Sequence, residues 1–439
     1  PNIVFILTDD QRFDEVSNMP IVESELAGKG TTFSNAFVSN PLCCPSRATL
    51  QTGQYSHSTN VYTNSPEHGG WETFHGSGDD RSTIASWLHS AGYRNALMGK
   101  YMNGYTAANA SFVPSGWNRW VAWAPRNREE DGYFDYPLSV DGVERDYGTA
   151  AADYSTDVLA TYAKTFIRRT PAGRPLFLWF ATRAPHGAAT PPPRYENTCE
   201  GLKATRYPDS READVSDKPE YIRSQPLPGI NAGDGQALRH CQSLLAVDDA
   251  VNVILRSLAA TGRLSDTMIV FMSDNGLLWN EHRWEGKMVP YEESIRVPLI
   301  VRYDPITGQE PTTDTHLIVN TDLAPTWAAL AGVDAPNVDG MSFLPLLDGS
   351  ATSWRSDFLL EHLFETLSHP VPTYCGVRNT RYVYVEYSTG EEELYDLSAD
   401  PFELNNLAGS QDPQDMQIRS AMHSRLLELC SPPPPGFTP

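Results

Sequence analysis

The sequence predicts an α/β fold with a large mixed, mainly parallel sheet flanked by helices, and a small C-terminal antiparallel sheet covered by one helix. Three observations support this prediction. Short apolar runs alternate with longer segments of helical periodicity. Polar side chains stand where several of these runs end. After about residue 352 the chain changes to closely spaced short strands rich in Tyr, Val and Leu. We therefore expect a large unit over residues 1–352 and a small unit over 353–439.

The N-terminal part of the large unit contains three predicted strands and two predicted helices. Branched apolar residues indicate buried strands at 1–8, 31–38 and 94–98. A helix is expected from Ser46 to Gln51, because proline is tolerated at a helix start and the following Gly53 favours a stop. The second helix, residues 82–90, begins with a serine cap and ends before Gly92.

The rest of the chain continues this alternation around two irregular segments. Residues 104–147 lack clear periodicity, and we expect a long surface excursion that shapes a pocket. Residues 187–233 are polar, with many Pro and Asp, and predict a loop over one face. Helical spacing predicts helices at 149–169, 235–260, 321–331 and 415–429. Apolar runs predict strands at 175–182, 267–272, 296–301, 358–360, 374–377, 382–386 and 393–395.

Charge and hydrophobicity argue against two broad classes of function. The 439 residues include 55 acidic and 33 basic side chains, which gives a net charge of −22. This balance argues against general binding of nucleic acid or anionic membranes. No apolar run approaches the roughly 18 residues that a membrane span requires. An anionic substrate would therefore need a local pocket with its own cationic side chains.

The six cysteines divide into an adjacent pair, Cys43 and Cys44, and four others. Four cysteines fit two disulfides with three possible pairings. Sequence neighbourhood favours the pairs Cys199 with Cys241 and Cys375 with Cys430. This usage favours an oxidising compartment. No secretory signal is visible within these residues, and its absence says nothing about localisation.

Polar side chains at four predicted strand ends form the main candidate site. In chain order they are Asp9, Asp10, Lys100, His186, Asp274 and Asn275. Because the carboxyl ends of parallel strands meet at one edge of a sheet, we expect these side chains to lie close together. Three carboxylates and an amide oxygen are the ligands that a hard cation prefers, either Ca²⁺ or Mg²⁺.

Further cationic side chains would surround this ion. They are Arg47, Lys100, His186, His282 and Lys287. A metal ion and several cations together suit a tetrahedral anion such as sulfate or phosphate. Each residue alone has a plainer interpretation: aspartate is common in turns, and lysine is usually a surface residue. The repetition at successive strand ends favours a site.

Cys43 stands at the predicted helix start, where free backbone N–H groups and the Arg47 guanidinium would converge. That is an anion-binding environment. From local chemistry alone, a buried pair of small apolar cysteines and half of a structural disulfide remain equally good interpretations.

Together these motifs resemble those of the formylglycine-dependent sulfatases of the alkaline-phosphatase-like superfamily, over nearly the whole chain. The motifs are Pro1-Asn2-Ile3-Val4 through Asp9-Asp10, Cys43-Cys44-Pro45-Ser46-Arg47-Ala48 through Thr52-Gly53, Gly99-Lys100, Ala184-Pro185-His186, Ser273-Asp274-Asn275-Gly276, Tyr291-Glu292, Arg296-Val297-Pro298, Asp322-Leu323-Ala324-Pro325-Thr326, Leu394-Tyr395-Asp396-Leu397, Asp400-Pro401 and Asn406-Leu407. The double cysteine and the Lys100-Tyr101 context are most similar to the glucosamine-6-sulfatase and heparan endosulfatase branch.

The resemblance implies a sulfuric ester hydrolase whose catalytic domain is residues 1–352. It implies that a formylglycine-generating enzyme oxidises Cys43, and that Cys44 occupies a variable position. It implies Ca²⁺, with Mg²⁺ as the alternative, bound by residue 43 together with Asp9, Asp10, Asp274 and Asn275. The hydrated aldehyde would attack sulfur, and its second hydroxyl would then expel sulfate.

The remaining site residues take roles from the same resemblance. Arg47 would stabilise the nucleophile, and Lys100, His186 and Lys287 would bind the sulfate and the leaving group. His186 is the first choice to protonate the departing oxygen. Many arylsulfatases have a histidine two residues after the lysine that matches Lys100, where this chain has Met102. The base is therefore open, and the neighbouring Asn103 and the more distant His282 are candidate substrate contacts.

Two other functions compete with this prediction. A phosphonate monoester or phosphodiester hydrolase of the same superfamily can share the cysteine motif, but typically shows Asp-His in place of Asp274-Asn275 and lacks the acid at Asp10. An inactive protein that binds sulfated glycans would not require a cysteine at position 43. We expect exo action on a short sulfated saccharide in a secreted, periplasmic or lysosomal-type compartment. The sequence does not predict the oligomeric state.

Overall fold

The computed structural model describes residues 1–127, 132–366 and 370–439. Its largest feature is a ten-stranded sheet with the order β13-β2-β12-β9-β1-β8-β4-β5-β6-β7. The centre of the sheet consists of β9 (Thr267–Ser273), β1 (Asn2–Asp9), β8 (Leu176–Pro185) and β4 (Arg94–Gly99), which run parallel. Every residue of β1 is buried, as expected for a strand covered on both faces. The predicted fold class is confirmed.

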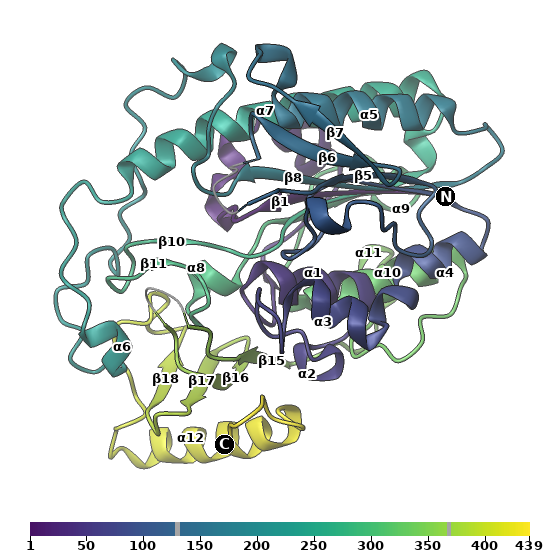
Figure 1. The fold of residues 1–439 in the computed structure, drawn as a ribbon. Coiled ribbons are helices and arrows are strands. Elements are labelled where there is room, and N and C mark those ends of the chain that lie inside the picture. The colour runs from purple at the N-terminus through teal and green to yellow at the C-terminus, as the bar shows by residue number, and fades with distance from the viewer. Residues whose placement is uncertain (128–131, 367–369) are drawn as a thin grey trace.

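Helices cover both faces of this sheet (Figure 1). On one side lie α5 (Ser155–Arg169) and α7 (Asp234–Ala260), and on the other α1 (Cys43–Thr52), α4 (Ile84–Ser90) and α10 (Leu323–Ala331). Successive side chains of β1 point to opposite faces of the sheet and so pack against both helical layers. Phe5 faces α10, and Val4 faces α5 and α7. The ring of Phe5 lies 4.9 Å from that of Trp327 in α10.

The helix with the two cysteines begins earlier than predicted. It starts at Cys43 rather than at Ser46, after an extended Leu42. It ends as predicted at Gly53, whose φ of 73° is the left-handed conformation that glycine adopts without a Cβ clash. The thiol of Cys43 therefore lies in the first turn of α1.

Residues 104–147 do not form the predicted surface excursion. They contribute β5 (Arg119–Trp123), β6 (Tyr136–Val140) and β7 (Val143–Tyr147), which extend the main sheet beyond β4. All five residues of β6 are buried, so no alternation of polar and apolar residues marks it as a strand. Residues 128–131, within the same predicted excursion, lie outside the described residues.

The strands at the opposite edge of the sheet are short, and one of them, β12, runs antiparallel to its neighbours. β12 (Leu299–Arg302) pairs antiparallel with β9 and with β2 (Thr31–Phe33), and β13 (Thr312–Asp314) forms the edge. The strand predicted over 31–38 is therefore divided into β2 and β3 (Ala36–Phe37), and β3 pairs with β14 (Ile318–Val319).

The remaining helices and strands of the large unit are short. They are α2 (Ser56–Thr59), α3 (Gly70–Ser77), α6 (Glu220–Arg223), β10 (Leu278–Trp279), β11 (Glu285–Gly286), α8 (Glu292–Ile295), α9 (Asp304–Thr307) and α11 (Leu344–Leu347). The loop predicted over 187–233 is irregular apart from α6 and one 3-10 turn at Pro193–Tyr195.

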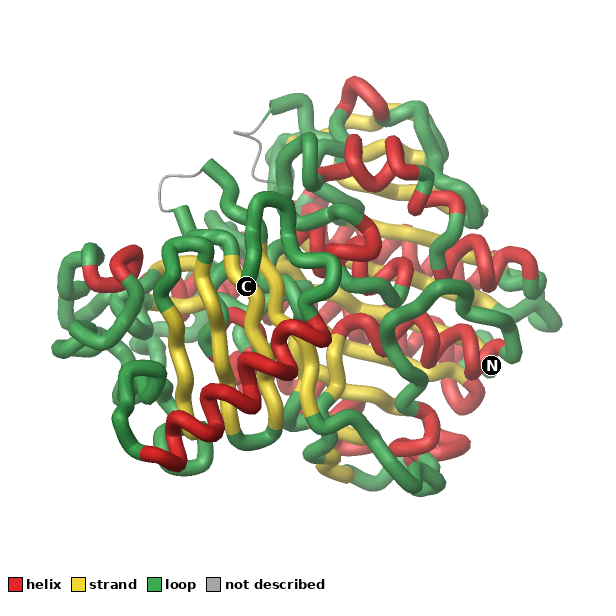
Figure 2. The backbone as a smooth tube through the Cα atoms, turned by 90° about the horizontal axis from the view of Figure 1, so that it is seen from below, coloured by secondary structure: helices red, strands yellow, loops and turns green. Residues whose placement is uncertain are grey.

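The C-terminal part is an antiparallel sheet of four strands in sequence order with one long helix lying across it (Figure 2). The elements are β15 (Asp357–His362), β16 (Tyr374–Asn379), β17 (Tyr382–Tyr387), β18 (Glu392–Asp396) and α12 (Pro413–Leu429). The face of the sheet away from α12 packs on the large unit, where Phe358 stacks on Phe37 at 5.0 Å between ring centroids. The division between residues 352 and 353 stays a prediction.

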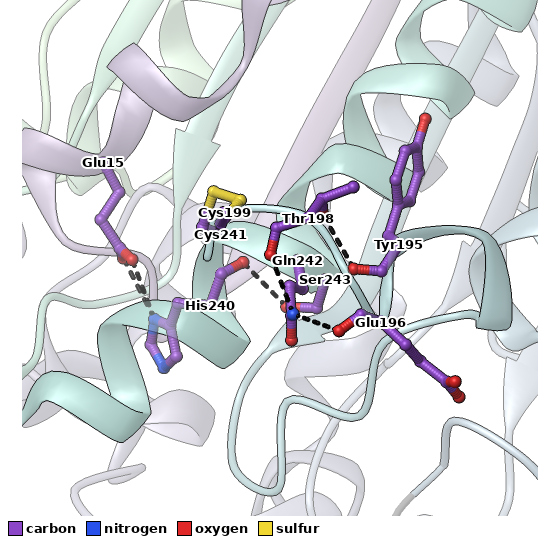
Figure 3. Close-up of a disulfide and its surroundings, with 9 residues drawn as sticks. All are labelled: Glu15, Tyr195, Glu196, Thr198, Cys199, His240, Cys241, Gln242 and Ser243. Carbon is purple, nitrogen blue, oxygen red and sulfur yellow. Dashed lines mark hydrogen bonds and ion pairs between the residues drawn. A yellow bond between two sulfur atoms is a disulfide. The ribbon is translucent and has the colours of Figure 1, made fainter. Parts of the chain in front are cut away.

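Two disulfides have the predicted pairing, Cys199–Cys241 and Cys375–Cys430. The first joins the 187–233 loop to α7, next to the hydrogen bonds that Gln242 donates to the carbonyls of Glu196 and Thr198 (Figure 3). Cys43 and Cys44 are buried free thiols. Within the described ranges, no helix combines the length and apolarity that a membrane crossing requires.

Candidate active site

The carboxyl ends of the central strands bring the predicted polar residues to one place. Asp9 ends β1 and Asp10 follows it, Asp274 and Asn275 follow β9, and Lys100 follows β4. The amide nitrogen of Asn275 donates to Asp10 Oδ1 at 2.7 Å, and the backbone N–H of Asp10 donates to Asp274 Oδ1 at 3.2 Å. This convergence is the geometry expected at the edge of a parallel sheet.

Cys43 joins these residues from the first turn of α1. Its Sγ lies 3.7 Å from Asp9 Oδ1 and 2.9 Å from Lys287 Nζ. The side chain is 1% exposed. Burial raises the pKa of the Cys43 thiol, although Lys100 and Lys287 act in the opposite direction. Its neighbour Cys44 points elsewhere, because its sulfur accepts the backbone N–H of Asn103 at 3.0 Å.

Arg47 lies one turn further along α1 and is fully buried. Its Nε donates to Asp274 Oδ2 at 2.8 Å, and its Nη1 donates to the Lys100 carbonyl at 2.8 Å. Lys100 Nζ lies 2.5 Å from Asp9 Oδ2, and Lys287 Nζ contacts Asp10 Oδ1. Each buried cation is therefore matched by a carboxylate, which is the condition for burying charge.

These cations keep two of the carboxylates ionised. Burial alone would raise the pKa of Asp10, but Lys287 and His186 outweigh it and lower the value to about 2. Lys100 and the other cations around Asp9 likewise overcome burial and hold its pKa well below the ordinary value. The pKa of Asp274 is raised instead, by burial and by the charge of Asp9. The site therefore concentrates negative charge on Asp9 and Asp10.

The donor set fits a divalent hard cation. Ligand atoms of Asp9, Asp10, Cys43 and His186 all lie within 4.8 Å of one another. The Lys287 ammonium lies among Asp10 Oδ1, Cys43 Sγ and Asn275 Oδ1, the last at 3.4 Å. These groups already face one common centre of positive charge. Most are oxygen donors, which suits Ca²⁺ or Mg²⁺.

His186 borders the same centre from the end of β8. Its Nε2 lies 3.7 Å from Asp10 Oδ2, and its Nδ1 pairs with the Gly187 carbonyl at 2.9 Å. Burial and the charge of Arg183 lower the pKa of His186. The ring is therefore neutral in the free protein near neutral pH, with Nδ1–H donating to the carbonyl and a lone pair on Nε2.

Arg183 belongs to the site although no motif in the sequence predicted it, and His282 lies outside the site. Arg183 Nη1 lies 3.7 Å from Asp9 Oδ2, and its guanidinium stacks on Trp123 in β5. Its position near the end of β8, three residues before His186, is the signal that could have identified it. His282 has no exposed surface, and its Nδ1 bonds Glu212 at 2.7 Å in a separate buried cluster. The structure therefore does not bring His282 to the site as a substrate contact.

Asn103 lies beside Cys44. Its backbone N–H holds the Cys44 sulfur, and its side-chain Oδ1 is buried without a hydrogen bond among the described residues. A cleft of about 510 Å³ opens next to Asp10 and His186. Arg239 and Gln236 of α7 line this cleft together with Glu285 of β11, which accepts a hydrogen bond from the Gln236 side chain. It is large enough for a small ligand.

Comparisons with known proteins agree with this arrangement. The family model described as Sulfatase matches residues 1–333, and the model described as N-sulphoglucosamine sulphohydrolase, C-terminal, matches residues 280–431. An N-acetylglucosamine-6-sulfatase of Capra hircus is 34% identical over 99% of this chain and 84% of its own length. The extracellular sulfatase SULF-1 homolog of Drosophila melanogaster is 31% identical over 82% of this chain and 33% of its own length.

This chain is also similar to a solved structure of a protein in complex with its substrate, D-glucosamine-2-N,6-O-disulfate. The two structures superpose with a TM-score of 0.82 and are 25% identical over 100% of both chains. The match of the family model to three quarters of the sequence includes Cys43, the acidic strand ends and both lysines. Sequence motifs, site geometry and relatives thus agree, and the chain belongs to the sulfatase family, whose members hydrolyse sulfuric esters.

Proposed function

We propose that this sulfatase removes the 6-O-sulfate of a glucosamine or N-acetylglucosamine unit through formylglycine at position 43 and a bound Ca²⁺. The observation that carries the proposal is the convergence of Lys100, Lys287 and Arg47 on the acidic residues beside Cys43. A sulfate ester is a tetrahedral anion, and a concentration of fixed cations next to a nucleophile position suits its transition state.

Position 43 is suited to the nucleophile by its place in the fold. It stands in the first turn of α1, where backbone N–H groups favour negative charge. As formylglycine hydrate it would supply one hydroxyl to attack sulfur and a second to release sulfate. Lys287, whose Nζ lies 2.9 Å from the sulfur of Cys43, would stabilise negative charge on the nucleophile. Arg47 would orient the Asp274 carboxylate through its hydrogen bond.

Ca²⁺ would be held by Asp9, Asp10, Asp274 and Asn275 together with residue 43. A bound ion there would neutralise charge on the nucleophile and on the sulfate oxygens. The low pKa of Asp10 supports this assignment, since a metal ligand must be deprotonated. Lys100 and Arg47 would keep the acidic residues in place through their contacts with Asp9 and Asp274.

His186 is proposed as the group that protonates the departing oxygen. In the free protein its lowered pKa leaves Nε2 without a proton. An anionic ester next to the ring favours the protonated form, so the proton would be taken up as the substrate binds. Arg183, whose Nη1 lies 3.7 Å from Asp9 Oδ2, would help to orient the Asp9 carboxylate.

The sugar would occupy the cleft beside Asp10 and His186. Its volume of about 510 Å³ suits a mono- or disaccharide rather than a long chain held along a groove. Arg239 lines this cleft from α7 and could pair with a second sulfate on the amino group of the sugar. The net charge of −22 opposes tight binding of a long polyanion, which favours exo action.

The maturation partner would be a formylglycine-generating enzyme. Two disulfides support a compartment of oxidising character, either outside the cell or in a lysosomal or periplasmic space.

The test combines the mass of the peptide that contains residue 43 with rates on paired substrates. We expect an aldehyde at residue 43, and faster hydrolysis of N-acetylglucosamine 6-sulfate than of its 3-sulfate isomer. An aryl sulfate should also react faster than the matching aryl phosphonate. Faster phosphonate turnover would replace the sulfatase assignment with a phosphonate monoester hydrolase, and an unmodified, inactive thiol form would favour a binding protein.

A further inference from the structure

A second cluster of buried acidic groups and a histidine lies outside the proposed active site. Asp209 belongs to the 187–233 loop, His282 follows β10, and Glu293 belongs to α8. These side chains are 0%, 0% and 5% exposed, respectively. One ligand atom of each lies within 4.8 Å of the others. None of the three has a role in the sulfatase reaction described above.

The atoms that face one another in this cluster lack partners. Both carboxylate oxygens of Asp209, Nε2 of His282 and Oε2 of Glu293 are buried and make no hydrogen bond to any part of the chain that the structure describes. His282 Nε2 lies 3.8 Å from Asp209 Oδ2, too far for a hydrogen bond. Leaving several such groups unsatisfied in the interior is costly, so their convergence calls for a ligand.

The other side of the His282 ring determines which nitrogen is available. Nδ1 lies 2.7 Å from Glu212 Oε2, and an ionised Glu212 favours the tautomer with the proton on Nδ1. Nε2 therefore presents a lone pair toward Asp209. Histidine ligands of zinc are commonly oriented in this way: one ring nitrogen donates to a carboxylate, and the other ring nitrogen faces the metal.

The neighbouring cations are already engaged elsewhere. Arg12 Nη1 lies 3.0 Å from Glu281 Oε1, and Lys218 Nζ lies 3.7 Å from Glu212 Oε1. Within the described ranges, neither Asp209 nor Glu293 forms an ion pair with a lysine or arginine. Arg12 acts on Glu293 only at a distance, beyond ion-pair range. The two carboxylates therefore have no lysine or arginine paired with them among the described residues, and one divalent ion would balance their combined charge.

We propose that Asp209, His282 and Glu293 bind a structural divalent ion, Zn²⁺ by preference, separate from the Ca²⁺ of the active site. One imidazole nitrogen with two carboxylate oxygens suits zinc better than calcium, which prefers oxygen donors alone. Two ligand atoms at about 2.1 Å from one ion lie at most about 4.2 Å apart, so the Asp209–His282 separation of 3.8 Å already fits.

This ion connects the substrate-side loop to the segment that carries Lys287. His282 lies five residues before Lys287, and Glu293 lies six residues after it. Asp209 anchors the same segment through its carbonyl, which accepts the backbone N–H of His282 at 3.1 Å. The ion therefore fixes both ends of the Lys287 segment against the 187–233 loop. Its loss loosens this part of the fold whatever the substrate is.

The experiment locates and counts the metal in the full chain. Protein purified with zinc and then dialysed into calcium buffer should retain about one zinc per chain by elemental analysis. Anomalous scattering on either side of the zinc absorption edge should place it among Asp209, His282 and Glu293. Removal by a chelator, followed by calcium alone, should lower the unfolding temperature by several degrees, and zinc should restore it.

Variants separate this site from other histidines. His282→Gln and Asp209→Asn should each reduce retained zinc at least about tenfold, while His362→Gln, at another buried histidine, should leave the zinc content unchanged. If a variant does not fold, the wild-type crystal still decides the question. Wild-type crystals without anomalous density, with Asp209 and Glu293 sharing a proton across a short hydrogen bond, would overturn the proposal.

Discussion

The ammonium group of Lys287 lies 2.9 Å from Cys43 Sγ and at the same time contacts the carboxylate of Asp10. Burial alone would lower the pKa of Lys287, but the charge of Asp10 outweighs it and raises the value. Lys287 is therefore a permanent cation between the proposed nucleophile position and the proposed metal ligands. In the proposed mechanism this charge would stabilise the transition state, because it requires no rearrangement as negative charge develops on the substrate.

Replacing this lysine should reduce turnover without unfolding the protein. Lys287→Ala removes one preorganised charge, so we expect kcat on a sugar sulfate to fall by about 10²–10³-fold. Steady-state kinetics measure the loss, and circular dichroism checks the fold. Lys29→Ala is the matched control, because Lys29 pairs with Glu25 at 2.8 Å on the surface. Equal activity of both variants would exclude Lys287 from the catalytic machinery.

The two adjacent cysteines should respond differently to the same substitution. Cys43→Ser should abolish turnover, because serine offers no aldehyde and no second hydroxyl to release sulfate. Cys44→Ser should retain most of the activity, because its hydroxyl can still accept the backbone N–H of Asn103. Burial raises the pKa of Cys44 to about 12, so this thiol stays protonated and inert.

Turnover assays of the two serine variants, with the residue 43 peptide checked by mass, decide this prediction. Full activity of Cys43→Ser would refute the assignment of the nucleophile. Loss of activity in Cys44→Ser with an unmodified residue 43 would instead mean that Cys44 is required for maturation.

The proposed proton donor should matter more for poor leaving groups. His186→Gln should lower kcat on a sugar 6-sulfate by about 10²–10⁴-fold, because an alkoxide leaves slowly without a proton. The same variant should lose far less on a nitroaryl sulfate, whose phenolate leaves without assistance. The measurement is kcat across a series of leaving groups. A uniform loss across the series would assign His186 to sulfate binding instead.

The sequence predicts the centre of this site well, because the site follows from the parallel sheet. Once residues 1–8 and 267–272 are recognised as buried strands, the acidic residues after them must meet at one edge. Gly53 likewise predicts the end of α1. Its positive φ is a local preference of glycine, so it can be expected without knowledge of the tertiary structure. The disulfide pairing follows from simple neighbourhood in the chain.

The errors arise where tertiary packing decides the outcome. β6 is buried on both faces and contains Pro137, so neither period nor propensity identifies it as a strand. His282 lies near Lys287 in sequence, but the turn between β10 and β11 directs its ring toward Glu212 instead of the active site. Arg183 was missed because only the paired sheet shows that it reaches Asp9.

Removing the Cys199–Cys241 disulfide should destabilise the loop that borders the cleft. The two cysteines are separated by 42 residues, so the crosslink restricts a sizeable loop in the unfolded chain. The Cys199→Ser/Cys241→Ser variant should lose about 2–4 kcal/mol of unfolding free energy. Denaturant unfolding measures the loss, and limited proteolysis should show new cleavage between residues 199 and 241. Cleavage confined to the C-terminal sheet would contradict this localisation.

A histidine at the contact between the large unit and the C-terminal sheet should make stability depend on pH. His57 Nδ1 in α2 lies 3.1 Å from Glu361 Oε2 in β15. Burial opposes the charged ring, but the hydrogen bond and the charge of Glu361 prevail and raise the pKa of His57. The stabilisation is therefore complete below the unfolded-state pKa of about 6.5 and is lost as the pH rises through the folded-state pKa.

His57→Gln should accordingly cost more stability in acid than in base. We expect a loss of a few tenths to about 1 kcal/mol near pH 5.5 and almost none near pH 8.5, measured by thermal unfolding at both values. Glu361→Gln is the matched test, because the substitution at His57 should have no pH-dependent effect in that background. An equal loss at both pH values would mean that the neutral hydrogen bond, rather than the ion pair, holds α2 against β15.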